Sequence, residues 1–181
     1  MSRIPYPDPA TLSEPKQALV RRLGDNLLNI SRMCMHAPDA QWAAQRELGQ
    51  VNLTGTTLGA RTREMVILTV AYLAESAYEL HHHKSVGAAA GITEAEFEAL
   101  RTRDFRALSP KDAAICQYVV ELVRDIRPSD ETLAAVRGHI SDEHLFEILF
   151  LAGYYMIIAR VIAVGDLEID DIYLDLSVRM K

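Results

Sequence analysis

Apolar residues recur at intervals of three and four along most of this 181-residue chain, and almost no stretch alternates as a half-buried strand does. Such spacing places side chains on one face of an α-helix. Prolines, glycines and capping residues interrupt the pattern at short intervals, so the sequence predicts an all-α fold built from separate helices. The predicted helices cover residues 16–35, 40–51, 58–73, 77–90, 94–100, 110–126, 129–138 and 142–164.

Residues typical of helix ends support these bounds. Gly91 can adopt the left-handed conformation that stops a helix, and Thr93 with Glu96 has the spacing of a capping box. Asp39 and Thr57 are predicted to cap the helices that follow them.

The chain is long enough for one domain with its own core. Four prolines near the start predict an extended arm over residues 1–18, followed by a helical domain over residues 19–165. The tail, residues 166–181, alternates only weakly and is compatible with a helix, an extended arm or both.

The predicted helix over residues 142–164 is apolar around most of its circumference. Its most apolar stretch, residues 148–159, is shorter than the roughly 20 residues needed to span a bilayer, so we expect no membrane insertion. A helix of this kind has to be covered on all sides. In a domain of this size, that predicts burial against a second subunit as well as against its own core.

Charge and cysteine content limit the partners and the compartment. The net charge of −6 and the absence of a Lys and Arg cluster argue against nucleic acid as a partner. Cys34 and Cys116 lie far apart, outside any CxxC pair, which fits a reducing compartment. The polar, proline-rich start does not resemble a secretory signal, so we expect a cytoplasmic protein.

The segment over residues 76–83 carries the candidate chemistry. Ser76, Glu79 and His83 are spaced three and then four apart, so on a helix they share one face. A carboxylate and an imidazole at this spacing can touch, and Glu79 would then raise the basicity of His83 for acid-base catalysis. The alternative is a non-catalytic helical oligomer, in which Ser76 and Glu79 only cap a helix and His83 is solvated.

A metal site is a further alternative. Consecutive helical residues point about 100° apart, so His81, His82 and His83 cannot converge on one ion, and at most one is expected to face a pocket. Glu64, Glu79 and His83 could hold a divalent ion if the preceding helix brings Glu64 across.

Side chains outside the motif have simpler interpretations as well. Glu64 follows Arg63 and could form only a surface ion pair. Tyr78 is expected to pack away from Glu79, whereas Tyr154 and Tyr155 are candidates for the pocket wall.

The order Arg63-Glu64, an apolar run, Ser76-x-x-Glu79-x-x-x-His83 and Gly91-Ile92-Thr93 resembles the carboxymuconolactone decarboxylase family. Residues 27–38 and 145–160 resemble the helices that precede and follow this motif, so the resemblance covers residues 20–165. It implies an alkylhydroperoxidase-D-like helical bundle that assembles as a homotrimer or hexamer.

The resemblance also separates two activities. In the peroxidase branch a CxxC pair would fall at positions 76 and 79, where this chain has Ser76 and Glu79, so thiol peroxidase chemistry is excluded at this site even if a family label suggests it. In the decarboxylase branch a Glu-Leu-x-x-His segment matches Glu79 to His83. This implies a lyase-like, cofactor-free acid-base enzyme that decarboxylates or isomerises a small oxoacid or lactone. Glu64, Glu79 and His83 would be catalytic, and Ser76, Tyr154 and Tyr155 would line the substrate pocket.

Overall fold

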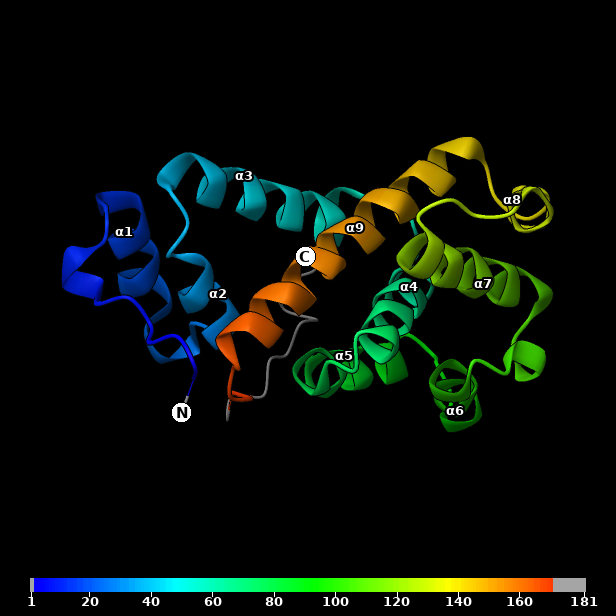
Figure 1. Cartoon of the computed structure of the whole chain (residues 1–181), viewed down its shortest axis with the longest axis horizontal. Helices are drawn as coiled ribbons and strands as arrows, with labels where there is room; N and C mark the ends of the chain where they lie inside the picture. The colour runs from blue at the N-terminus through cyan, green and yellow to red at the C-terminus, as the bar shows by residue number, and fades with distance from the viewer. Residues whose placement is uncertain (1, 171–181) are drawn as a thin grey trace.

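The structure, a computed structural model, describes residues 2–170 (Figure 1). These residues form α-helices and short 3-10 or π turns and contain no strand, which confirms the predicted all-α fold. The helices are α1 (Glu14–Leu23), α2 (Asn29–Cys34), α3 (Asp39–Gln50), α4 (Ala60–Leu73), α5 (Ala77–Ala89), α6 (Glu94–Thr102), α7 (Pro110–Asp125), α8 (Asp130–Arg137) and α9 (Asp142–Gly165).

Helix α4 lies at the centre of the bundle and packs against α5, α7 and α9. Every residue from 63 to 71 is buried, so α4 has no solvent face along this part of its length. Helix α9 runs across the molecule from the end near α8 to the end near α2, as Figure 1 shows. The main apolar cluster joins α4, α7 and α9 through residues such as Val66, Val119 and Ile148. A side chain that leaves α4 toward α5 therefore points into the protein interior.

The predicted helix over residues 16–35 is two helices instead of one. Helix α1 ends at Leu23, and Gly24 has a φ of 51°, a left-handed conformation that glycine adopts without the steric cost of a Cβ. A 3-10 turn follows, and α2 begins only at Asn29. The apolar spacing continues through the break, which is why periodicity alone did not reveal it.

The extended arm predicted over residues 1–18 is shorter in the structure. A 3-10 turn occupies Pro9–Thr11, and α1 already begins at Glu14. Pro15 lies in the first turn of α1, where a missing backbone N–H costs nothing because the first amides of a helix have no internal partner. Pro15 therefore did not indicate extended backbone, although the predicted extended arm included it.

Most predicted helix ends are confirmed, and two are corrected. Gly91 has a φ of 88°, and Thr93 with Glu96 forms a full capping box at α6. Asp39 is the first residue of α3 rather than its cap. Thr57 lies before the start of α4, and its backbone N–H and hydroxyl donate to the carboxylate of Glu147 at 2.8 and 3.0 Å. A π-helical turn, Val51–Gly55, fills the space between α3 and this contact.

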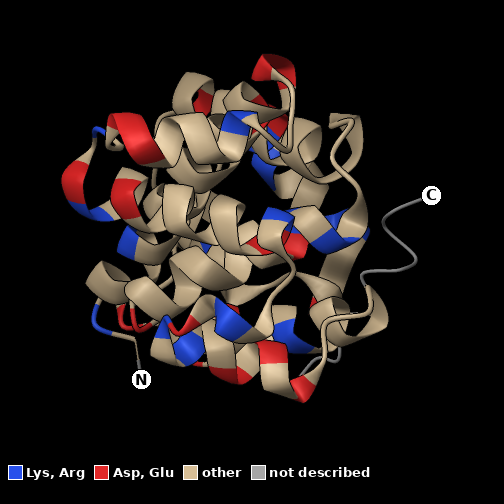
Figure 2. Ribbon diagram, turned by 90° about the vertical axis from the view of Figure 1, so that its right-hand side faces the viewer, with Lys and Arg blue, Asp and Glu red and all other residues tan. Residues whose placement is uncertain are grey.

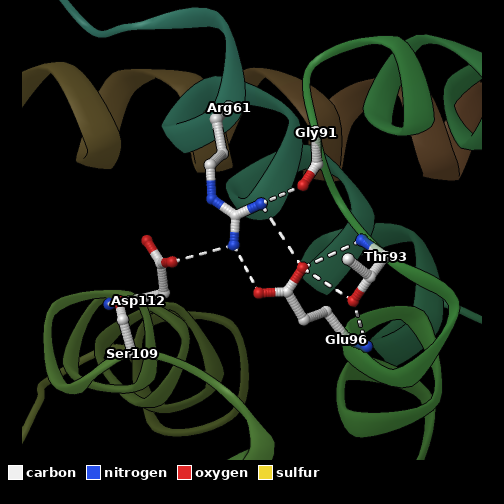
Figure 3. Close-up of polar contacts among 6 residues, drawn as sticks. All are labelled: Arg61, Gly91, Thr93, Glu96, Ser109 and Asp112. Carbon is white, nitrogen blue, oxygen red and sulfur yellow. Dashed lines mark hydrogen bonds and ion pairs between the residues drawn. The ribbon is translucent and has the colours of Figure 1, made fainter.

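An arginine network holds α4, α6 and α7 together (Figure 3). The guanidinium of Arg61 donates to the carbonyl of Gly91 at 2.6 Å, to Glu96 at 2.6 Å and to Asp112 at 3.0 Å. Glu96 is also the residue that closes the capping box with Thr93. The start of α4 is therefore fixed against two neighbouring helices, one turn from Glu64.

Charged residues of both signs are interspersed around the face drawn in Figure 2. Helix α9 differs from this surface because several large apolar side chains along it are exposed. Within residues 2–170 it is also the one helix long and apolar enough to cross a membrane, although 44% of its most apolar window is buried inside the protein. A core helix can have the same composition, so composition alone does not assign α9 to a membrane.

The chain continues beyond α9 without a helix over residues 166–170. Leu167 packs with Met33 and Ile162, and Asp170 accepts a hydrogen bond from the backbone N–H of Asn29 at 2.8 Å. This short segment therefore lies against α2. The rest of the tail predicted over residues 166–181 lies outside the described residues.

Candidate active site

A cavity of about 260 Å³ lies between α2, α3, α4, α5 and α9. Its apolar wall includes Leu28, Trp42 and Ile158, and its polar lining includes Glu64, Glu79 and His83. Three residues that the sequence singled out as candidates for catalysis thus border one cavity. The non-catalytic alternative predicted no pocket around His83, and the cavity contradicts that prediction.

His83 is held between two buried groups from different helices. Its Nδ1 lies 2.8 Å from Oε2 of Glu64 on α4, and its Nε2 lies 3.2 Å from the hydroxyl of Tyr155 on α9. The two rings meet edge to face, with centroids 5.2 Å apart. A carboxylate can only accept, so the network assigns the proton of neutral His83 to Nδ1 and makes Nε2 the acceptor for the Tyr155 O–H.

Glu64 is 1% exposed and is also bound by Arg63, whose Nε lies 3.3 Å from Oε1. The surface ion pair considered for Glu64 is therefore wrong, because both partners are buried. A second guanidinium nitrogen of Arg63 donates to the carbonyl of Leu53 in the π-helical turn. Arg63 thus orients the carboxylate that in turn orients His83.

Glu79 does not form the predicted contact with His83. Both of its carboxylate oxygens are buried and have no hydrogen-bond partner among residues 2–170, while the Nδ1 of His83 is used by Glu64. Burial raises the pKa of Glu79 to about 7, and the hydroxyl of Ser76 acts in the opposite direction. Glu79 is therefore a cavity-lining carboxyl group that can exchange a proton near neutral pH.

Ser76 is the N-cap of α5. Its hydroxyl accepts a hydrogen bond from the backbone N–H of Glu79 at 3.3 Å. The capping box is only half formed, because the Glu79 carboxylate makes no return hydrogen bond. Ser76 was expected in the substrate pocket, but it is not among the residues that line the cavity.

Tyr154 and Tyr155, which the sequence offered as candidates for the pocket wall, both line the cavity. Burial raises the pKa of Tyr155 well above 10, with the nearby Glu64 carboxylate adding to the effect. Burial likewise raises the pKa of Tyr154 to about 12. Both phenols therefore stay protonated at neutral pH, and Tyr154 accepts a hydrogen bond from Gln45 at 2.8 Å.

His82 and Tyr78 are also at the cavity, which sequence reasoning missed. His82 and His83 both line it, so the expectation that at most one of the three histidines faces a pocket is wrong. Neighbouring side chains on a helix diverge by about 100°, but a cavity that extends along the flank of α5 can meet both. Tyr78 was expected to pack away from the site, and it is indeed buried, but it borders the same cavity. Hydrophobic spacing carries no signal for such a role.

Within the described part of the chain, no three His, Cys, Asp or Glu side chains gather closely enough to hold a metal ion. Glu64, Glu79 and His83 share the cavity, but His83 and Glu64 are hydrogen-bonded to each other.

Comparison with known proteins assigns the fold. Residues 38–121 match the model of the Carboxymuconolactone decarboxylase family. Over this segment the chain is similar to the carboxymuconolactone decarboxylase family, and the chain has the AhpD-like fold. No curated protein is similar enough to count as a match.

Several solved structures share this fold at low sequence identity. A peroxidase-related protein from Ralstonia eutropha JMP134, described as having an alkylhydroperoxidase AhpD core, is 16% identical, with a TM-score of 0.76 over 94% of this chain and 93% of its own. A peroxidase-related protein from Silicibacter sp. TM1040 is 15% identical, with a TM-score of 0.76 over 94% and 92%. A protein of unknown function from Agrobacterium tumefaciens, named as a candidate AhpD antioxidant defence protein, is 16% identical, with a TM-score of 0.66 over 79% and 97%.

The two cysteines of this AhpD-like chain lie away from the motif. Cys34 borders the cavity from α2, and burial raises its pKa to about 11. Cys116 is completely buried on α7, and burial raises its pKa to about 12. Both are protonated thiols at neutral pH, whereas redox and nucleophilic chemistry requires a thiolate.

Proposed function

We propose that this protein is a cofactor-free acid-base enzyme that decarboxylates or isomerises a small oxoacid or lactone. The observation that carries the proposal is the buried Glu64–His83–Tyr155 chain beside Glu79, a carboxyl group with no partner among the described residues. Buried, mutually oriented titratable groups at one cavity are typical of acid-base catalytic sites. The carboxymuconolactone decarboxylase match over residues 38–121 is consistent with this class of reaction.

Each group has a distinct role in the proposed reaction. Glu64 holds the Nδ1 proton of His83, which leaves Nε2 as the basic nitrogen that takes a proton from the carbon next to a carbonyl. Tyr155 stays protonated, so its O–H can turn from His83 to a substrate oxygen and stabilise the negative charge that develops there. Glu79 in its protonated form is the proton donor.

In a decarboxylation, the bond between the substrate and its carboxylate carbon breaks, and carbon dioxide leaves. The electron pair of that bond enters the neighbouring carbonyl as an enolate, whose oxygen is stabilised by the Tyr155 O–H. Glu79 then delivers a proton to the enolate, and solvent restores the proton to Glu79. An isomerisation uses the same enolate without loss of carbon dioxide, with His83 removing the first proton.

Thiol peroxidase activity by the CxxC mechanism is not proposed. The chain has Ser76 and Glu79 where that mechanism needs cysteines, and the thiols of Cys34 and Cys116 are not close enough in sequence or activated enough to replace them. The peroxidase-related descriptions of the structural neighbours are therefore not extended to this protein.

The test is proton NMR of the full chain in D2O with γ-carboxymuconolactone and a panel of β-oxoacids. We expect decarboxylation, or deuterium uptake next to a carbonyl, for at least one compound. His83→Ala and Glu64→Gln should each lower isomerisation, or deuterium uptake into substrate that has kept its carboxylate, by about 100-fold or more, because each removes the oriented base that takes the first proton. The partly buried His144 on α9, which does not line the cavity, provides the matched control, since His144→Ala should leave turnover unchanged.

Two outcomes would contradict the proposal. One is the absence of turnover and exchange across the panel with folded wild-type protein. The other is undiminished isomerisation or deuterium uptake in His83→Ala, which would show that His83 is not the base. Circular dichroism of each variant shows whether the helical fold is retained.

A further inference from the structure

A second imidazole and carboxylate meet at the same cavity. Nε2 of His82 lies 3.4 Å from Oδ2 of Asp170, and the two side chains are 7% and 4% exposed. This is an ion-pair distance, and Nε2 makes no hydrogen bond within residues 2–170. The ring of Tyr78 packs against the His82 ring at a centroid distance of 4.7 Å. His82 and Tyr78 both line the cavity, but the proposed reaction above uses neither of them.

Asp170 is held firmly although it lies beyond the last helix. It accepts hydrogen bonds from the backbone N–H of Asn29 at 2.8 Å and from the hydroxyl of Tyr78. The side-chain amide of Asn29 also donates to the carbonyl of Glu168 at 3.1 Å, so α2 binds this segment at two points. Burial acts to raise the pKa of Asp170. The neighbouring His82, Tyr78 and Asn29 together outweigh this effect and keep the pKa of Asp170 below its ordinary value.

We propose that His82 is a second proton-carrying group of this cavity and that Asp170 is its positioning residue. The juxtaposition parallels the first pair, because adjacent histidines of α5 each face a buried carboxylate from another part of the chain. Glu64 comes from α4, within the matched family segment, whereas Asp170 comes from the segment that follows α9. The proton-carrying role of His82 in turnover rests on the proposed function. The positioning of the His82 ring by Asp170 does not.

The two pairs hold their imidazoles in opposite ways. Glu64 faces Nδ1 of His83, whereas Asp170 faces Nε2 of His82. An ionised carboxylate attracts an N–H, so neutral His83 carries its proton on Nδ1, hydrogen-bonded to Glu64, and we expect neutral His82 to carry it on Nε2, the nitrogen that faces Asp170. His83 then offers Nε2 to a ligand, and His82 offers Nδ1. In turnover, Nδ1 of His82 takes a proton from a substrate O–H or C–H, the electron pair stays on the substrate, and Asp170 balances the imidazolium charge.

Histidine NMR tests the orientation without any substrate. Two-bond proton–nitrogen spectra of the full chain labelled with ¹⁵N-histidine distinguish the two tautomers, and His82→Gln and His83→Ala assign the signals. At about pH 8.5, where imidazoles are neutral, we expect the Nε2–H form for His82 and the Nδ1–H form for His83. Asp170→Ala should shift His82 to a mixture of tautomers and leave His83 unchanged.

Matched variants separate positioning from a general structural effect. Asp170→Asn keeps an oxygen that can accept from Nε2–H, so it should restore the wild-type tautomer of His82. Asp166→Asn changes an exposed residue of the same segment, whose φ of 50° asparagine also tolerates, and should alter neither histidine. A predominant Nδ1–H form of His82 in the wild type would overturn the proposal, as would an unchanged His82 signal in folded Asp170→Ala.

Kinetics test the role in turnover with the panel compound that the wild type converts. His82→Gln should lower kcat about tenfold or more, and Asp170→Ala should lower kcat with a smaller change in KM, while Asp170→Asn recovers part of the loss. Unchanged kcat in His82→Gln would overturn the proton-carrying role. If the wild type converts nothing, the proposed function fails, whereas the tautomer measurement still decides whether Asp170 positions His82.

Discussion

Glu79 couples the stability of this protein to pH. Burial raises the pKa of Glu79 from 4.5 to about 7 in the folded state, whereas the unfolded chain retains the ordinary value. The folded state thus binds this proton more tightly, so its contribution to stability is complete below about pH 4.5 and is lost as the pH rises through about 7. We predict that Glu79→Gln, which cannot ionise, becomes more stable than the wild type at pH 8, by up to about 3 kcal/mol, and is similar to it at pH 5.

Urea unfolding of both proteins at the two pH values measures this difference. The comparison between wild type and variant cancels the other carboxyl groups, which titrate in both. Glu98→Gln is the control, because Glu98 is exposed on α6 and forms an ion pair with Arg101. Equal stability of wild type and Glu79→Gln at pH 8 would contradict this prediction. It would show that the ionised Glu79 carboxylate is stabilised in the folded protein, so that its pKa is not raised.

The sequence singled out Glu64, Glu79 and His83, which share one cavity, but not the partners of these side chains. Glu79 and His83 have the i, i+4 spacing of a helical pair, and that spacing suggested a contact. In the folded chain Glu64 reaches Nδ1 of His83 instead, because α4 packs directly against α5. Which carboxylate meets an imidazole depends on interhelical packing, and a single sequence does not encode that in its local spacing.

At the scale of elements, the approach of α3 to α9 depends on a glycine. A Cβ added at Gly49 would lie 2.4 Å from the hydroxyl oxygen of Tyr154 and 2.9 Å from its Cζ. Gly49→Ala should therefore push the ring away from α3, break the hydrogen bond from Gln45 and destabilise the protein by about 1–3 kcal/mol. Urea unfolding gives the change in free energy.

Two further variants identify the cause. Tyr154→Phe removes the hydroxyl that a Cβ would meet first, so the double variant should be less destabilised than the sum of the two single variants. Gly59→Ala is the control, since no heavy atom lies within 4 Å of its added Cβ, and a change of less than about 1 kcal/mol is expected at this cap position. Strict additivity of Gly49→Ala and Tyr154→Phe would contradict the proposed contact.

Helix ends that carry a capping side chain could be predicted from the sequence. A helix break that depends on backbone conformation, and a long-range contact, could not. Ser76 and Thr93 each accept a hydrogen bond from the backbone at the start of a helix, as their spacing to Glu79 and Glu96 predicted. The break at Gly24 falls within a continuous apolar pattern, so periodicity did not separate α1 from α2. The segment over residues 166–170 is fastened by Asp170 to the start of α2, a long-range contact without a local signature.

At the scale of the whole molecule, the sequence predicted that α9 is buried against a second subunit. The exposed side chains of α9 show which face would be buried. Phe146, Phe150, Ile157 and Val164 are 58%, 56%, 50% and 58% exposed. Their separations of four and seven residues place them on one face of the helix. Large exposed apolar side chains aligned in this way mark association surfaces rather than a surface that faces water.

We therefore predict a homo-oligomer whose subunits bury this face of α9. Light scattering after gel filtration should give a mass of three or six times the 20.2 kDa of one chain, as the resemblance implies. Phe150→Asp should dissociate the assembly, because a charge buried in an apolar interface has no partner. Ile126→Asn is the control, since Ile126 is 83% exposed at the C-terminal end of α7 and its φ of 66° suits asparagine, so the oligomer should persist. A monomeric wild type, or a Phe150→Asp variant with unchanged mass, would mean that the face of α9 does not join subunits.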